Sequence, residues 1–406
     1  MYSRYCAVRE ETLLSREILG KRSGFLDWDT QPSMFKTYPL FLPRIPLERI
    51  PQLQWLYHTR FVSDTQFIAD KAYQRLNVPS AGNLHPIEIY VQLRNIPDLP
   101  SGLYHVSPQE RDLILIREIG KEGIESSVGL KNRFNGAIVI LSLAPFRSYW
   151  KYALRSWRYL YLDLGHQIAT LDASVRHFEH SLSCMSPTKE LSVHLGFGED
   201  EYVAAVYGIG EIAQREAYPI AKPLMQVKPT DYSEPMTPLM SKLAEGFCYS
   251  QIPVSSPIHN FQHINAIRRS ARSFNPLVEC DDTIKKFMQI PYALSLTPLF
   301  VVLRAHSMHC GIYKNNTLVR EGKFANEMVR LLLDQRFIGN AAMIVLMYAD
   351  DFDERSHIEA GVFAQSIYFH SHALGLGCSG IGAFFDDEAH AYESKNLIYA
   401  VAIGGQ

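Results

Sequence analysis

Three apolar segments in the first half of the chain have counterparts in the second half, and the three pairs occur in the same order. The pairs are 102–105 with 311–314, 137–143 with 342–348, and 206–210 with 401–405. The offset between partners falls from 209 (311 − 102) to 195 (401 − 206), which requires only shorter loops in the second half. Short apolar strands also match by chance, so it is the shared order that favours an internal duplication.

Apolar runs and prolines divide the 406 residues into four parts, because a chain of this length is long for one hydrophobic core. Residues 1–50 carry aromatic and proline punctuation, and we expect them to form an arm over a core. Residues 51–215 and 259–406 have globular patterns. Residues 216–258 hold seven prolines and are expected to form a linker or excursion.

Local patterns predict both strands and helices, and therefore an α+β fold. The apolar runs 137–143 and 202–210 predict buried strands, and the pattern over 149–180 predicts one long helix. Residues 87–92 alternate apolar with polar side chains, which predicts a half-buried strand.

Composition indicates an ordinary soluble protein. Hydrophobic residues make up 47%, charged residues 20%, and the formal net charge is −2, so nothing favours nucleic acid or an anionic membrane as a partner. The first residues carry charges where a secretory signal needs an apolar run, and no apolar run reaches the length of a membrane span. The six cysteines lie far apart and form no Cys-x-x-Cys pair, which argues against a zinc site or a disulfide scaffold and for reduced, cytoplasmic thiols.

A tight polar loop precedes the strand predicted at 87–92. Pro79 fixes one backbone torsion, and Gly82 permits a conformation that other residues avoid. Ser80 and Asn83 can donate and accept hydrogen bonds next to exposed backbone N–H groups. Such a loop suits the edge of a flat polar ligand, although an ordinary turn before a strand explains the same residues.

The second half opens with a basic cluster. Arg268, Arg269 and Arg272 lie at i, i+1 and i+4, with Ser270 among them. On a loop that enters a helix, two of these guanidiniums would converge on one phosphate as planar forks. A solvated, basic helix start is the alternative. No Gly-x-x-x-x-Gly-Lys loop or strand-linked Gly-x-Gly-x-x-Gly motif supports a nucleotide site of the usual kinds.

Four glycines within eight residues follow a helix that we expect to end near Leu374. Gly375 or Gly377 would suffice as the helix C-cap. Gly380 and Gly382 are not needed for a cap, and they would let the backbone approach the face of a ligand.

Lys151 and Tyr152 lie at the start of the helix predicted over 149–180. Arg155 and Arg158 share the face of Lys151 at helical spacing. A lysine next to a tyrosine can act as a general acid or base if burial lowers the lysine pKa. The alternative is a helix that rests its aromatic side chains on the core and leaves its charges in solvent.

In combination, these motifs resemble the nitroreductase superfamily of FMN proteins, most closely its SagB-type dehydrogenase (azoline oxidase) branch and tandem members with two nitroreductase-like halves. The resemblance covers most of 55–180 and 262–404. It is carried by residues 79–86, 102–105, 150–152, 158–159, 163–166, 268–274 and 373–384. It implies two halves, each with a mixed, largely antiparallel sheet flanked by helices, that form an internal pseudo-dimer.

The resemblance also implies one FMN per chain, bound by both halves. The residues that would hold its phosphate are Arg268, Arg269, Ser270 and Arg272. The residues that would contact its ring are Gly380, Ile381, Gly382 and Ala383 from the second half, and Pro79, Ser80, Ala81, Gly82 and Asn83 from the first. The first half lacks the Arg-Arg-Ser motif and the second lacks the Pro-Ser-x-Gly-Asn loop, so the symmetry-related site would be lost. Further association of two chains is left open.

Lys151 and Tyr152 match the Lys-Tyr pair that supports proton abstraction in azoline oxidases, although Ala153 and Leu154 stand where Gly-Glu commonly follows. The match implies dehydrogenation of a C–N or C–C bond in a small molecule or modified peptide, with the flavin as hydride acceptor. Two alternatives stay open: an NAD(P)H-dependent nitro or quinone reductase, and a degenerate subunit without turnover.

Overall fold

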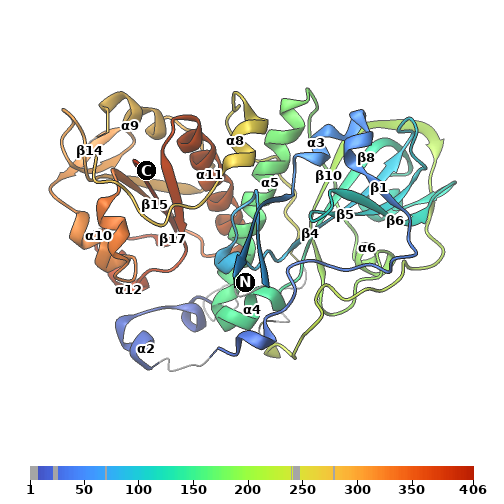
Figure 1. Ribbon diagram of the computed structural model, residues 1–406, viewed down its shortest axis with the longest axis horizontal. Coiled ribbons are helices and arrows are strands. Elements are labelled where there is room, and N and C mark those ends of the chain that lie inside the picture. The colour runs from blue at the N-terminus through green and yellow to red at the C-terminus, as the bar shows by residue number, and fades with distance from the viewer. Residues whose placement is uncertain (1–7, 22–25, 69–70, 239, 241–246, 278) are drawn as a thin grey trace. The chain divides into compact units, whose positions relative to one another are not determined.

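The computed structural model describes residues 8–21, 26–68, 71–238, 240, 247–277 and 279–406 (Figure 1). The chain divides into two compact units. The first unit is residues 27–252, and the second unit is residues 1–26 together with 253–406. The boundaries predicted at 50, 215 and 258 stay predictions.

The first unit is built on a seven-stranded sheet whose neighbouring strands are all antiparallel, in the order β1-β6-β5-β4-β8-β10-β9. Its strands are β1 (Arg44–Pro46), β4 (Ile87–Arg94), β5 (Gly102–Ser107), β6 (Asp112–Glu118), β8 (Asn132–Leu143), β9 (Ser183–Cys184) and β10 (Tyr202–Glu216). The buried strands predicted at 137–143 and 202–210 are confirmed, because they lie within β8 and β10.

Short elements and one long helix complete the first unit. They are η1 (Trp28–Thr30), η2 (Leu47–Arg49), η3 (Pro51–Leu53), α3 (Gln54–Tyr57), β2 (Val62–Ile68), β3 (Lys71–Leu76), η4 (Ala81–Asn83), β7 (Glu122–Gly123), η5 (Glu125–Val128), α4 (Phe146–Tyr152), η6 (Ala153–Arg155), α5 (Ser156–His177), α6 (Glu190–His194) and β11 (Tyr218–Pro219). The helix α5 packs on α3, α4 and β4.

The single helix predicted over 149–180 is wrong at its start. The backbone of Ala153 has φ 47° and ψ −136°, which interrupts the helical hydrogen-bond ladder between α4 and α5. Alanine is the best helix former, so its presence gives no warning of such a break. Lys151 and Tyr152 therefore end α4, whereas Arg158 lies on α5.

The second unit is built on a six-stranded antiparallel sheet in the order β14-β13-β12-β15-β17-β16. Its strands are β12 (Leu296–Val302), β13 (Gly311–Lys314), β14 (Thr317–Glu321), β15 (Met343–Ala349), β16 (Gly377–Ile381) and β17 (Asn396–Gly404). Its helices are α2 (Arg16–Lys21), α8 (Phe261–Ile267), α9 (Asp281–Met288), α10 (Ala325–Leu331), η7 (Arg336–Asn340), α11 (Glu354–Ala373) and α12 (Asp386–Ala389). The helix α11 packs on β16 and β17 (Figure 1).

The two sheets share one strand order. The series β6-β5-β4-β8-β10-β9 in the first unit corresponds to β14-β13-β12-β15-β17-β16 in the second. In each, a long helix follows the central strand: α5 after β8, and α11 after β15. The three segment pairs found in the sequence fall on corresponding strands. The predicted α+β fold with two halves on largely antiparallel sheets is therefore confirmed.

Parts of the predicted arm 1–50 belong to different units. Residues 44–46 form the edge strand β1 of the first sheet. In the second unit, the Leu14 N–H donates to the Asp386 carboxylate at 2.8 Å, and the Asp386 N–H donates back to the Leu14 carbonyl at 2.9 Å. Of the helices in the described parts of the chain, none combines the length and the apolar character needed to cross a membrane.

The strand β4 is buried on both faces, so the half-buried strand predicted there is wrong. Glu88 on β4 accepts a hydrogen bond from Arg147 at 2.6 Å and from Arg60 at 3.3 Å, and lies 2.9 Å from His105 Nε2. Burial alone would raise the pKa of Glu88, but the two guanidiniums outweigh burial and hold its pKa well below the usual range. The acidic residue that suggested a solvated face is thus an ionised side chain inside the core, where two arginines balance its charge.

Replacing Glu88 tests this buried cluster. Glu88→Gln leaves Arg60 and Arg147 buried without their carboxylate, and we expect a loss of about 3–5 kcal/mol in unfolding free energy. All four tryptophans (Trp28, Trp55, Trp150, Trp157) lie in the first unit, so urea unfolding followed by tryptophan fluorescence reports on it. The exposed control Glu110→Gln is expected to change little. A loss below about 1 kcal/mol for Glu88→Gln would contradict the role of the cluster.

Candidate functional site

The predicted site residues form two groups, one in each unit. In the first unit, the loop 79–83 has an uncommon backbone. Gly82 and Asn83 have φ of 65° and 60°, and His85 follows with φ 48°, all in the left-handed region that favours glycine. Side chains hold this shape: Asn83 Nδ2 donates to the Gln74 carbonyl at 2.8 Å, and His85 Nε2 lies 3.0 Å from Asn83 Oδ1.

A buried carboxyl group anchors the loop. Ser80 Oγ donates to Asp163 Oδ2 at 2.5 Å, and the Ala81 N–H donates to Asp163 Oδ1 at 3.2 Å. The His85 N–H donates to Ser80 Oγ at 2.9 Å. Asp163 lies on α5 with 4% of its surface exposed. Burial raises the pKa of Asp163 to about 7, although the bonds from Ser80 and Ala81 act in the opposite direction.

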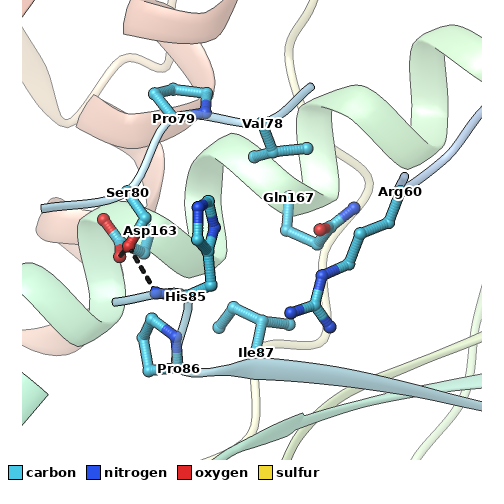
Figure 2. Close-up of a pocket in the computed structure, with 9 residues that line it drawn as sticks. All are labelled: Arg60, Val78, Pro79, Ser80, His85, Pro86, Ile87, Asp163 and Gln167. Carbon is cyan, nitrogen blue, oxygen red and sulfur yellow. Dashed lines mark hydrogen bonds between the residues drawn. The ribbon is translucent and has the colours of Figure 1, made fainter. Parts of the chain in front are cut away.

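A small cavity lies beneath the loop (Figure 2). It is lined by Arg60, Val78, Pro79, Ser80, His85, Pro86, Ile87, Asp163 and Gln167. Asp163 and Ser80 lie at one end in Figure 2 and Arg60 at the other. The cavity volume of about 10 Å³ holds roughly one water molecule and is far too small for an aromatic ring system. The inner face of the loop is therefore packed, and a flat ligand would have to contact another face.

Lys151 and Tyr152 adjoin this loop. A Cβ atom added to Gly82 would lie 2.7 Å from Tyr152 Oη and 3.3 Å from Lys151 Cδ, so glycine is required for this approach. Lys151 Nζ lies 5.2 Å from the ring centroid of Trp28 and 5.6 Å from that of Tyr152. The expectation that the pair starts a helix is wrong, since both residues end α4. The structure nevertheless brings the pair and the loop together.

In the second unit, the basic cluster follows a helix. Arg268 is the C-cap of α8, and the next helix, α9, begins only at Asp281. The expectation of a loop entering a helix is therefore wrong. A helix C-terminus carries partial negative charge, so an anion bound here would depend on the guanidinium groups and not on helix N–H groups.

The hydroxyl of Tyr368, on α11, joins the basic cluster to the glycine segment. It lies 2.8 Å from Ser270 Oγ and accepts a hydrogen bond from the Gly380 N–H at 2.7 Å. The Ala271 N–H donates to the Cys378 carbonyl at 2.8 Å, which fixes the same approach through the backbone. The structure thus brings Ser270 and Gly380 to one tyrosine that the sequence analysis did not select.

The predicted phosphate-binding arginines have different environments. Arg268 is 4% exposed, its guanidinium lies 5.4 Å from the Tyr368 ring centroid, and burial lowers its pKa to about 10. Arg269 is half-buried, and its N–H donates to His372 Nε2 at 3.0 Å. Arg272 is exposed. The Arg269 guanidinium donates to the Ala266 and Arg268 carbonyls at 3.3 and 2.8 Å. Consecutive arginines followed by a serine supply guanidinium and hydroxyl donors of the kind that bind phosphate.

Part of the glycine segment after α11 is a strand. Gly377, Gly380 and Ile381 lie in β16, where Ile381 is paired with Ala400 of β17. A Cβ atom on Gly380 would lie 2.0 Å from Tyr399 Oη, so packing of a tyrosine explains this glycine. Its N–H is bonded to Tyr368, which conflicts with a role as donor to a flavin. Gly382 and Ala383 follow the strand and are half-buried.

Tyr368 and Asp163 are buried and were not among the site residues predicted from the sequence. Asp163 lies in one of the segments that carry the family resemblance, and that signal alone could have identified it. Nothing in the sequence distinguishes Tyr368 from a core tyrosine. Among the described residues, no group of three or more His, Cys, Asp or Glu side chains is placed to bind a metal ion.

Removing the Tyr368 hydroxyl tests whether it holds Ser270 and Gly380 together. Tyr368→Phe leaves the Gly380 N–H and Ser270 without this partner, and we expect a loss of about 1–3 kcal/mol in unfolding free energy. Urea unfolding followed by circular dichroism measures it. Tyr392→Phe, which removes a half-exposed bond to Glu327, is the matched control and should cost less. Equal, small losses for both variants would contradict the role of Tyr368.

Sequence comparisons find similarity to nitroreductases in the last quarter of the chain. The nitroreductase family model matches residues 311–404. A curated protein of Methanocaldococcus jannaschii, named "putative nitroreductase MJ1384", is 33% identical over 94 residues, which are 22% of this chain and 46% of that protein. The chain therefore spans about half the length of the curated relative that it matches.

Solved structures extend the similarity to the whole chain. The crystal structure of a "putative nitroreductase" from Anabaena variabilis covers 99% of both chains with a TM-score of 0.82 and 21% identity. A "putative nitroreductase" from Desulfovibrio desulfuricans, solved in complex with FMN, covers 36% of this chain and 86% of that chain with a TM-score of 0.28 and 17% identity. The chain thus has a nitroreductase-like fold over its whole length, and the match to the nitroreductase family model is confined to residues 311–404.

Proposed function

We propose that this chain is an FMN-dependent oxidoreductase that dehydrogenates a small molecule or a modified peptide. The observation that carries the proposal is the gathering of Arg268, Arg269 and Ser270 against α11 and β16, within the unit that holds the family match. The proximity of Gly82 to Tyr152 and Lys151 in the first unit is the second support.

We also propose that the two units are tandem halves that share one FMN. The common strand order of the two sheets supports this arrangement. The residues suited to phosphate lie in the second unit, whereas the Pro-Ser-x-Gly-Asn loop and the Lys-Tyr pair lie in the first. Each unit would therefore supply what the other lacks, and a chain would bind a single FMN.

The chemistry of the side chains fits this cofactor. When bound, FMN supplies an acceptor for hydride. Arg268 and Arg269 would hold its phosphate by charge-assisted hydrogen bonds, and Ser270 would add a hydroxyl donor. Gly382 and Ala383, beyond the end of β16, remain the candidates for backbone contact with the ring.

The Lys-Tyr pair would manage the substrate proton. Tyr152 Oη reaches the Gly82 loop, so it would take the proton from the carbon or nitrogen that is oxidised. The Lys151 ammonium, close to the Tyr152 ring, would favour the phenolate form of Tyr152, which is the form that can accept this proton. The rings of Trp28 and Tyr152 favour a cation at this position and would keep Lys151 in place.

An absorption spectrum of the purified protein, before and after anaerobic addition of NADPH, tests the proposal. Yellow protein that NADPH does not bleach is the expected result. Bleaching would favour an NAD(P)H-dependent nitro or quinone reductase. Colourless protein that also fails to bind added FMN would contradict a flavin enzyme and favour a subunit without turnover.

Arg269→Ala tests the phosphate-binding group. Loss of a charge-assisted hydrogen bond is expected to weaken FMN binding by about 1.5–3 kcal/mol, which is about 10- to 150-fold in Kd. Fluorescence titration of flavin-free protein with FMN measures this change. Arg320→Ala, on the exposed strand β14, is the control and should bind FMN as the unmodified protein does. An unchanged Kd for Arg269→Ala would remove this residue from the site.

Lys151→Ala tests the proton-transfer role. The variant should retain FMN and lose about 100-fold or more in kcat for oxidation of the substrate, which is the scale of general acid–base catalysis. Steady-state kinetics and flavin content measure the two properties separately. Lys222→Ala, an exposed lysine of the same unit, is the control. Full activity of Lys151→Ala would exclude the role.

A further inference from the structure

Asp163 holds the loop 79–83 although its carboxyl group is buried. It accepts hydrogen bonds from Ser80 Oγ at 2.5 Å and from the Ala81 N–H at 3.2 Å. The next residue of the loop is Gly82, which is the residue that approaches Tyr152 and Lys151. The hydrogen bonds of Asp163 therefore hold the two residues that precede Gly82 in the loop.

The second unit contains a counterpart of this anchor. Asp163 lies 14 residues before the end of α5 (177 − 163), and Glu359 lies 14 residues before the end of α11 (373 − 359). Ser295, just before β12, donates to the Glu359 carboxylate as Ser80, before β4, donates to Asp163. A serine bonded to a carboxyl group of the long helix is thus common to both units.

The two anchors differ in charge. Glu359 is paired with Arg355, whose Nε lies 2.8 Å from Glu359 Oε1. In the described part of the chain, Asp163 has only the Ser80 and Ala81 donors and no ion pair. A buried carboxylate without a counter-ion is costly, and neutralisation by a proton relieves that cost. Asp163, in the unit that contains the Lys-Tyr pair, is therefore the one of these two carboxyl groups that can gain and lose a proton near neutral pH.

We propose that Asp163 is a positioning residue of the flavin site: its carboxyl group places the loop 79–83 against Lys151 and Tyr152, and a proton on Asp163 tightens that placement. The flavin part of this inference rests on the proposed function. The anchoring of the loop does not, because it concerns residues of the first unit alone.

Other titratable groups surround Asp163 and define the controls. His85 and Arg60 line the same cavity, with Arg60 at its far end (Figure 2). Lys151 and Tyr152 adjoin the loop from α4, and Tyr159 and His166 lie on α5 itself. Comparison of the unmodified protein with Asp163→Asn isolates the contribution of Asp163, because all these groups are present in both.

The direction of the pH effect follows from the two states of the loop. With the loop in place, burial raises the pKa of Asp163 to about 7, whereas a displaced loop would hydrate the carboxyl group and return its pKa to about 3.8. The placed loop then binds the proton more tightly. Its stabilisation is complete below the lower pKa and is lost as pH rises through 7, by about tenfold in the placed-to-displaced ratio between pH 6 and 8.

Hydrogen–deuterium exchange of residues 79–86, corrected for intrinsic exchange rates, tests the inference without flavin. In the unmodified protein, protection should fall about tenfold from pH 6 to 8. The fall should be about tenfold smaller in Asp163→Asn, in which only the other titratable groups remain. Glu359→Gln, the matched variant of the second unit, should behave as the unmodified protein. The same pH dependence in Asp163→Asn as in the unmodified protein would overturn the inference.

A second pair of variants keeps the test decisive if Asp163→Asn does not fold. Ser80→Ala removes the bond to the carboxyl group and should lower protection of residues 79–86 by about tenfold at pH 6. Ser295→Ala removes the corresponding bond in the second unit and should leave that segment unchanged. Equal protection in Ser80→Ala and in the unmodified protein would overturn the anchoring role.

Titration with FMN at pH 6 and pH 8 separates this inference from the proposed function. The Kd of the unmodified protein should rise more than that of Asp163→Asn over this interval, by at most about tenfold, because the apparent Kd follows the population of the placed loop. Absence of FMN binding by the unmodified protein would overturn the proposed function, while the exchange experiment still decides the role of Asp163. Binding with the same pH dependence in both proteins would overturn the positioning role and leave the flavin proposal standing.

Discussion

In each unit a long helix is buried along nearly its whole length and still carries polar side chains. Because buried polar groups need hydrogen-bond partners, such a helix dictates where nearby loops lie. Asp163 on α5 holds the loop 79–83, and Tyr368 on α11 joins Ser270 to Gly380. The helices that complete the cores are thus also the elements that shape both groups of candidate site residues.

The fold could be predicted where a segment carries its own signal. The apolar runs that became β8, β10 and β15 are long, and three ordered matches already pointed to two similar halves. Features that depend on distant partners could not be predicted. The strand β4 alternates like a half-exposed strand, and Arg60, His105 and Arg147, which lie elsewhere in the sequence, explain why Glu88 is buried. The helix break at Ala153 depends on surroundings that its residue type does not reveal.

The candidate site divides in the same way. Motif resemblance selected the loop 79–83, the basic cluster and the Lys-Tyr pair. The structure brings the loop close to the Lys-Tyr pair in the first unit, and it brings Ser270 of the basic cluster close to Gly380 in the second. Motif resemblance did not predict the hydrogen bonds that hold these residues in place. Those bonds join Asp163 to Ser80, 83 positions apart, and Tyr368 to Ser270, 98 positions apart. The structure gives a different reason for Gly380. The Tyr399 hydroxyl fills the space that a side chain would need, and the Tyr368 hydroxyl accepts the hydrogen bond from the Gly380 N–H.

The central proposal is that the two units, as tandem halves, would contribute different residues to the binding of one FMN. The ratio of FMN to protein at saturation, measured by calorimetric titration of flavin-free chain, tests it most directly. The account predicts one FMN per chain, and loss of that binding when either Arg269 or the Gly82 loop is altered. Two FMN molecules per chain, or undiminished binding after a change in one of these groups, would contradict it.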